Sequence, residues 1–278
     1  MIKNNKNLKV LLLILMSTTL SACATINQPI NANSSGFWDG IILYNLSRLI
    51  IAISNLFAGN YAIGIIIFTV ILHILLLPLN QMQMKSQQKM MEIQPELDAI
   101  KAKYPNRDRQ SMELLQTEQQ ALLDEKGVNQ FAGCLPLLIQ LPILTALYQA
   151  ILRTEVLRQG HFLWMNLGQR DPYFVLPLLA AGLAFWTTYL TTKANPQNNP
   201  MARSMTYFMP IMIFIISMSL PSAVALYLVV SNLVRLISIL LFNNPYKIIE
   251  ERKAEAAAKK AKEKELRKAL KKAQKIRS

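Results

Sequence analysis

Cysteine, histidine and glycine are all scarce in this chain, and their scarcity excludes several classes of protein. The only two cysteines, Cys23 and Cys134, lie far apart and cannot build a disulfide framework or a CxxC metal site. The two histidines are isolated, and no GxGxxG, P-loop or HExxH motif is present. No apolar stretch is glycine-rich or repeated, so the inverted-repeat architecture of many transporters is not indicated.

Acidic residues are also few, with 16 Asp plus Glu against 30 Lys plus Arg and a net charge of +14, although 52% of the residues are hydrophobic. The charges lie between and after long apolar runs. A run of about 20 apolar residues crosses a hydrocarbon layer as a helix. Lipid cannot satisfy backbone hydrogen bonds, and continuous rather than alternating runs exclude a barrel. The sequence therefore predicts an all-α membrane protein.

The N-terminus has the order of a signal peptide. Three lysines precede the apolar stretch Val10 to Met16, and small residues follow. The sequence Leu20-Ser21-Ala22-Cys23 resembles a bacterial lipobox, which implies that 1–22 is removed and that Cys23 carries a diacylglyceryl and an N-acyl lipid. Two acyl chains would anchor the chain stably outside the cytoplasm. The alternative is an uncleaved anchor helix with an incidental cysteine.

Five membrane spans are predicted, at about 61–80, 131–152, 173–192, 204–220 and 222–242. With Cys23 outside, the 81–130 loop, the 193–203 loop and the tail from 243 lie in the cytoplasm. These carry seven, two and thirteen Lys or Arg, whereas the outer 153–172 segment carries three. This distribution agrees with the positive-inside tendency. We expect a multi-pass protein of the bacterial cell membrane with its C-terminus in the cytoplasm.

The segment 37–57 is long enough to be a sixth span, but a further crossing would place the basic tail outside. Its polar residues Tyr44, Asn45, Arg48 and Asn55 fall within about a third of the helix circumference. We therefore predict an amphipathic helix in the outer interface, within an extracytoplasmic segment 23–60, with Trp38 at the headgroups.

The 81–130 loop is rich in charges of both signs, and apolar residues recur at helical spacing on either side of Pro105-Asn106. This pattern predicts a cytoplasmic helical hairpin. The tail 243–278 has a composition that favours helix.

Four segments resemble the YidC/Oxa/Alb family of membrane protein insertases, in the order that the family has them. They are Ile66–Met91 with TVILHILLLPLNQMQMKSQQKM and a turn at Gln94-Pro95-Glu96-Leu97; Gly133–Ile143 with Ala146-Leu147-Tyr148; Phe162–Leu167 with Asp171-Pro172-Tyr173 and Leu176-Pro177; and Met209–Pro221 with Leu226-Tyr227 and Ser231-Asn232.

The resemblance implies a five-span core, 61–242, around a polar groove that is open to the cytoplasm and to lipid. The groove would accept the polar part of an incoming chain while its apolar segment enters lipid, without covalent chemistry. The implied partners are nascent membrane proteins, the Sec translocon, membrane lipids and, through the basic tail, the ribosome. The alternative for the tail is a topology determinant that touches anionic lipids. No enzymatic activity and no cofactor besides the Cys23 lipid are expected.

Position 73 departs from the family, which usually has an arginine in the groove where this chain has His73. Helix rise places His73 roughly 18 Å, and Arg235 about 20 Å, from the outer surface. Tyr227, Ser231, Arg235 and Ser238 share one helix face. We therefore hypothesise that this stripe lines the groove and that Arg235 supplies the missing cation. The alternatives are a neutral, hydrogen-bonded His73 and an Arg235 that snorkels to the cytoplasmic headgroups.

Further groove candidates are Gln140, Thr187, Thr188 and Asn232, whose alternative role is hydrogen bonding between helices. Two other classes of function remain open from the residues alone. A small solute transporter or channel is disfavoured by the absence of repeats and of intramembrane carboxylates. A lipid-modifying enzyme would need a base or metal set beside Ser231 and Arg235, and none accompanies them.

Overall fold

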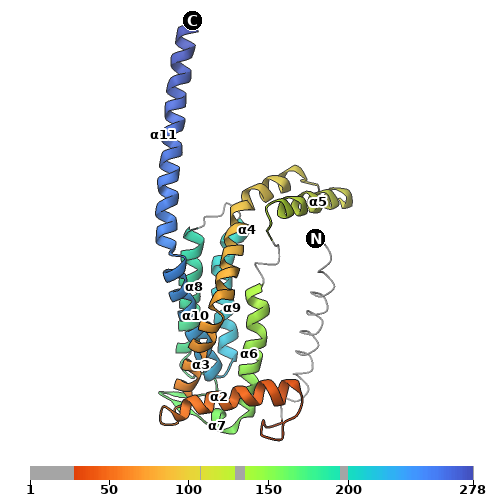
Figure 1. Ribbon diagram of the computed structural model, residues 1–278, viewed down its shortest axis with the longest axis vertical. Coiled ribbons are helices and arrows are strands. Elements are labelled where there is room, and N and C mark those ends of the chain that lie inside the picture. The colour runs from red at the N-terminus through yellow and green to blue at the C-terminus, as the bar shows by residue number, and fades with distance from the viewer. Residues whose placement is uncertain (1–27, 107, 129–134, 195–199, 278) are drawn as a thin grey trace.

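A computed structural model describes residues 28–106, 108–128, 135–194 and 200–277, and these are mostly helical (Figure 1). Cys23 and Cys134 lie outside this part. The elements in chain order are η1 (Phe37–Leu43), α2 (Tyr44–Asn55), α3 (Tyr61–Leu75), α4 (Leu77–Lys103), α5 (Arg109–Glu125), α6 (Leu135–Arg153), α7 (Glu155–Arg158), β1 (His161–Phe162), β2 (Met165–Asn166), α8 (Val175–Ala194), α9 (Pro200–Ser219), α10 (Ser222–Phe242) and α11 (Pro245–Arg277).

Helices α3, α6, α8, α9 and α10 run side by side, and the remaining elements gather at the two ends of this bundle (Figure 1). The α4–α5 hairpin and the long helix α11 project from one end. Helix α2 lies across the opposite end, where α7 is also found. The hairpin and the tail therefore share a side of the bundle, and α2 occupies the other side.

The described helices include several that could cross a membrane. Phe37–Asn55, α8 and α10 are each long and apolar enough, and α3 with α4 forms a bent fourth candidate. Because α2 lies across the bundle rather than along it, its length alone does not make it a span (Figure 1). The fold is that of a multi-pass helical membrane protein, with the short β1–β2 pair as an addition that the sequence did not predict.

The first predicted span is not a straight helix. Helix α3 ends at Leu75, and α4 begins at Leu77 at an angle of 59° to it. Pro78 lies in the first turn of α4, where backbone N–H groups have no acceptor within the helix, so the N–H that proline lacks is not missed. The turn expected at Gln94-Pro95 is wrong, since α4 continues through Pro95 to Lys103. A proline inside a helix removes one backbone bond, and here the packing of the hairpin maintains the helix.

The hairpin has a small core of its own, formed by Ile93, Leu97, Leu123 and Val128. Its helices reverse between Lys103 and Arg109, where the sequence predicts the Pro105-Asn106 turn. Asp108 caps α5 by accepting a bond from the Ser111 backbone N–H at 3.1 Å. Hydrogen bonds from Ser111 hold the pKa of Asp108 below its usual value. The cap is therefore complete at neutral pH and is lost as the pH falls through that lowered pKa.

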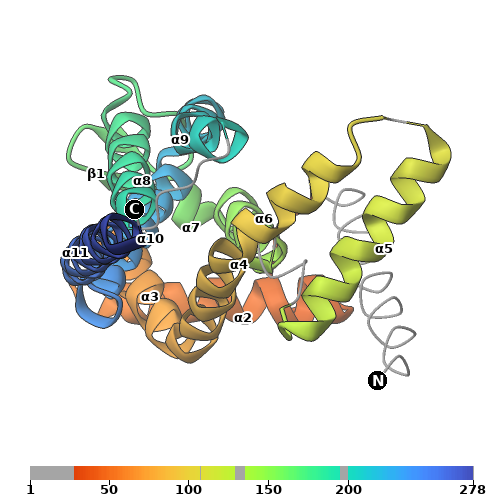
Figure 2. The same ribbon diagram turned by 90° about the horizontal axis from the view of Figure 1, so that it is seen from above.

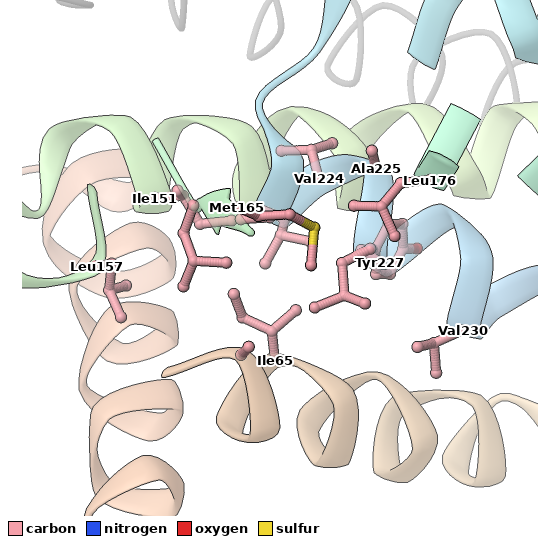
Figure 3. Packing of buried hydrophobic residues seen from close by; sticks show 14 of the residues in the cluster. Ile65, Ile151, Leu157, Met165, Leu176, Val224, Ala225, Tyr227 and Val230 are labelled. Carbon is pink, nitrogen blue, oxygen red and sulfur yellow. The ribbon is translucent and has the colours of Figure 1, made fainter. Parts of the chain in front are cut away.

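The main core lies at the α2 end of the bundle (Figure 3). Ile65 of α3, Ile151 of α6, Leu176 of α8 and Tyr227 of α10 meet there, together with Met165 of the β1–β2 segment. The connection that follows β2 is hydrogen-bonded to the start of α10: the Ser222 and Ala223 backbone N–H groups donate to the carbonyls of Gln169 and Leu167 at 2.6 and 3.1 Å. This end of the bundle is therefore closed by packed side chains.

Helix α2 crosses α3 at Gly64, where the two backbones come close. A Cβ atom at Gly64 would lie 2.9 Å from the Ile50 carbonyl oxygen and would overlap the Ser54 hydroxyl. Ser54 is fully buried and donates to the Ile50 carbonyl at 2.7 Å. Only glycine allows this crossing without displacement of α2.

We predict that Gly64→Ala lowers the free energy of unfolding by about 1–3 kcal/mol, the usual cost of an added carbon in a tightly packed contact. The matched control is Gly182→Ala in α8, where a Cβ meets no atom within 4 Å. That change should be neutral or slightly stabilising, since alanine favours helix. Thermal unfolding in detergent measures both, and equal midpoints for the two variants would contradict the close crossing.

Candidate functional site

A cavity of about 360 Å³ lies between α4, α8, α9 and α10 and reaches the first turn of α11. It is found toward the hairpin end of the bundle, because α4 and α11 contribute to its wall, whereas the core of Figure 3 fills the other end. The cavity wall combines hydroxyl, amide and thioether groups with one guanidinium. It is lined by Met84, Gln87, Gln88, Met91, Ala184, Thr187, Thr188, Thr191, Thr192, Ala194, Met209, Ile213, Asn232, Arg235, Ile239, Asn243, Pro245 and Ile248.

Arg235 is the one charged residue among the described residues that line this cavity. Its side chain is exposed, although it lies between apolar neighbours in the half of α10 that is nearer the hairpin. No carboxylate of the described part forms an ion pair with it. A cation in such surroundings is stable where water reaches it, and the cavity provides that access.

The α8 side of the cavity is a wall of threonines. Thr187, Thr188 and Thr191 each donate to a carbonyl one turn earlier in the helix at 2.8 Å, and Thr192 bonds to Thr206 of α9 at 3.0 Å. On α10, the Asn232 amide nitrogen donates to the Leu228 carbonyl at 2.8 Å. Because the hydroxyl protons of Thr187, Thr188 and Thr191 are already used, these threonines offer oxygen lone pairs to a polar chain or to water.

A second polar cluster lies between α3, α6 and α10, outside the cavity lining. The Gln140 amide nitrogen donates to the Tyr227 hydroxyl at 3.0 Å. Tyr227 is fully buried, and its ring centroid lies 6.3 Å from that of His73. His73 Nδ1 lies 2.9 Å from the Thr69 carbonyl oxygen, which can only accept, so Nδ1 carries a proton and donates. Ser231 is also buried here.

The residues named from the sequence thus fall into two groups. Thr187, Thr188, Asn232 and Arg235 come together on the cavity wall, whereas His73, Gln140, Tyr227 and Ser231 lie in or beside the core. Sequence reasoning did not assign the other polar residues of the wall. Thr191 and Thr192 repeat the spacing of Thr187 and Thr188 by one helical turn, and that stripe was the available signal. No such repeated spacing distinguishes Gln87, Gln88 and Asn243 in the sequence.

A bundle of apolar helices, several of them long enough to cross a bilayer, defines a multi-pass membrane protein. The chain belongs to the 60Kd inner membrane protein family, whose model matches residues 52–251.

Relatives of the chain carry the name membrane protein insertase. The chain is 46% identical over 249 residues to the "Membrane protein insertase YidC" of Pediococcus pentosaceus, across 89% of this chain and 88% of that one. It is 40% identical over 226 residues to the "Membrane protein insertase MisCA" of Bacillus subtilis, across 81% and 87% of the two chains. A solved structure, "Active YidC insertase crystal structure with the first transmembrane domain resolved", is similar with a TM-score of 0.58 and 27% identity. That match covers 81% of this chain, which spans half of the solved one.

Neighbouring positions on α10 test the boundary between cavity and core. We expect a cysteine at Asn232, on the cavity wall, to react with a hydrophilic maleimide at least about tenfold faster than a cysteine at the buried Ser231, because burial suppresses the reactive thiolate. Labelling is measured in a Cys134→Ser background, with that background as the blank. Equal labelling of the two positions would contradict the placement of the cavity.

Proposed function

We propose that the chain is an insertase that admits the polar segment of an incoming membrane protein into the cavity around Arg235 while the adjoining apolar segment enters lipid. The observation that carries this proposal is a cavity with a partly polar wall that holds one cation, Arg235, which forms no ion pair with any described residue. Membership of a family whose relatives are named membrane protein insertases supports it.

The cavity would act by lowering a solvation barrier. An unpaired amide or hydroxyl transferred from water into hydrocarbon costs roughly 2–7 kcal/mol. Threonine and asparagine oxygens on the wall accept hydrogen bonds from such groups, and Arg235 donates to acidic side chains or carbonyls. No bond is made or broken in this process. The proposal therefore needs binding and orientation alone, and it assigns no catalytic residue.

Arg235 takes the place that an arginine at position 73 holds in the family. His73 donates through Nδ1 to Thr69, and its ring packs beside Tyr227 rather than on the cavity wall. Arg235 lies on the wall, at nearly the same depth by helix rise. We propose that the cation of the groove has moved from α3 to α10 in this chain.

The proposed arrangement in the membrane has five spans, which correspond to α3 with the start of α4, α6, α8, α9 and α10. Residues 37–55 would lie in the outer interface, and the hairpin and α11 would lie in the cytoplasm. Their grouping at opposite ends of the bundle supports this topology (Figure 1). We also propose that 1–22 is a signal peptide and that Cys23 carries the lipid anchor, on the strength of the lipobox-like sequence.

Helix α11 is proposed as a ribosome contact, and cooperation with the Sec translocon is proposed for larger substrates. The support for the first is a 33-residue helix that projects from the bundle and is rich in lysine and arginine (Figures 1 and 2). Phosphate contacts by such a helix would be independent of sequence.

Purified protein in liposomes, supplied with a short single-span membrane protein, tests the insertion site. Arg235→Gln should reduce the insertion rate about tenfold or more, as expected for a lost charge-assisted hydrogen bond, and Arg235→Lys should retain most of it. The matched control is Arg170→Gln in the exposed outer loop, with no expected effect. Full activity of both Arg235 variants would reject the site, and solute flux without insertion would favour a transporter instead.

The tail is tested by co-sedimentation with ribosomes over a series of salt concentrations. Replacement of Lys259, Lys260, Lys262 and Lys264 by glutamine should weaken binding and lower the slope of log affinity against log salt, because fewer counterions are released. If the variant instead loses binding only to anionic vesicles, the tail is a lipid contact.

A further inference from the structure

Helix α6 is buried along one half and more exposed along the described part of the other half. Its outer half is buried, with Leu147, Ala150 and Ile151 fully enclosed in the core. In its inner half, residues 139–145 are all partly or largely exposed, and Leu141 is 47% exposed. Both views place α6 on one side of the bundle, away from α8 and α11 (Figures 1 and 2).

The outer end is fixed by Arg153. Its guanidinium forms a bidentate pair with Asp39 of η1, at 2.6 and 3.0 Å, and donates to the Gln28 carbonyl at 2.7 Å. The arginine side chain is 2% exposed and that of Asp39 is 18% exposed. Two further bonds hold this end: Trp38 of η1 donates to Gln149 of α6 at 3.1 Å, and Thr154, just after α6, donates to Ser47 of α2 at 2.9 Å. Paired and buried charges of this kind are costly to separate.

The inner half has one comparable link. Among the described residues, the Gln140–Tyr227 bond is the side-chain hydrogen bond that joins residues 139–145 to another helix. Thr145 bonds within α6 to the Leu141 carbonyl. Pro142 lies two residues from Gln140 and removes a backbone bond from the helix. Gln140 thus holds a segment that its own helix supports weakly.

The contacts of α6 are concentrated at its outer end. Its main partners there are η1, α2 and α7, with smaller contacts to α10 and α4, and among the described residues none of similar extent to α8 or α9. By contrast, α8 packs extensively on α9 and α10, and α3 packs on both α2 and α10. The inner half of α6 is therefore easier to displace than its outer half.

We propose that Gln140 and Arg153 are positioning residues that make α6 a hinged wall. Arg153 fixes the outer end, the Gln140–Tyr227 bond latches the inner half, and that half swings at Pro142 to let an apolar segment pass into lipid. The role in passage rests on the insertase function proposed above. The latch itself is a property of the protein without substrate.

The latch is tested by hydrogen exchange of the backbone amides of α6 in lipid nanodiscs. Tyr227→Phe and Gln140→Leu should each accelerate exchange of residues 139–145 about fivefold, the factor expected for one hydrogen bond. The double variant should exchange no faster than either single one, because both remove the same bond. Residues 149–153 should be unaffected, whereas Arg153→Gln should accelerate exchange there.

Tyr148→Phe is the matched control, since it is the same change within α6 at a tyrosine that forms no hydrogen bond among the described residues. Exchange that is unchanged in both latch variants, or additive in the double variant, would overturn the latch.

Insertion into liposomes tests the role in passage, with two single-span substrates that differ in the hydropathy of their span. The latch variants should insert the weakly hydrophobic span several times faster and the strongly hydrophobic span at the wild-type rate. A weakly hydrophobic span gains less free energy on transfer to lipid, so the latch slows it more. Equal loss for both spans would show a merely structural bond and would reject the proposal. Absence of insertion by the wild type would reject the insertase function instead. The hydrogen-exchange result would still show whether the Gln140–Tyr227 bond holds the inner half of α6.

Discussion

An arginine inside an apolar bundle has to be paired with an anion or hydrated, and this requirement organises the inner half of the protein. No carboxylate occurs in the segments predicted to span the membrane, and none of the described residues forms an ion pair with Arg235. Water that enters an open cavity with a partly polar wall can hydrate Arg235. The threonines of α8 and Asn232 of α10 form that wall, and α4 and α11 leave it accessible from the hairpin end.

Helix α10 contributes both to the packed core at one end of the bundle and to the cavity at the other. Its first six residues are buried in the core and bonded to the outer connection, whereas Asn232 and Arg235 further along face the cavity. The change occurs between Ser231 and Asn232. A polar segment that enters from the hairpin end would thus meet hydroxyl groups and a cation first and packed apolar side chains afterwards, which limits how far it can move before lipid becomes the better environment.

The sequence was sufficient for the helical class, the positions of most helices and the residues on α8 and α10 that meet at the cavity, because long apolar runs and helical spacing are local patterns. It was insufficient where distant contacts decide. Helix α4 continues through Pro95 because α5 packs against it, and the bend at Leu76 separates two helices within one apolar run. Tyr227 and Ser231 share a face with Arg235, yet the packing of α3 and α6 encloses them and leaves only Arg235 on the wall.

The contacts of His73 can be understood from the same packing. His73 donates to its own helix and contacts Tyr227, which Gln140 holds in turn, so position 73 contributes to the joint between α3, α6 and α10. A second guanidinium at this depth would repel Arg235 and would need its own route to water. A chain with its cation on α10 can therefore use position 73 for packing. In this arrangement the cation on the cavity wall and the contacts that hold α6 reside in different residues, so each can change without loss of the other.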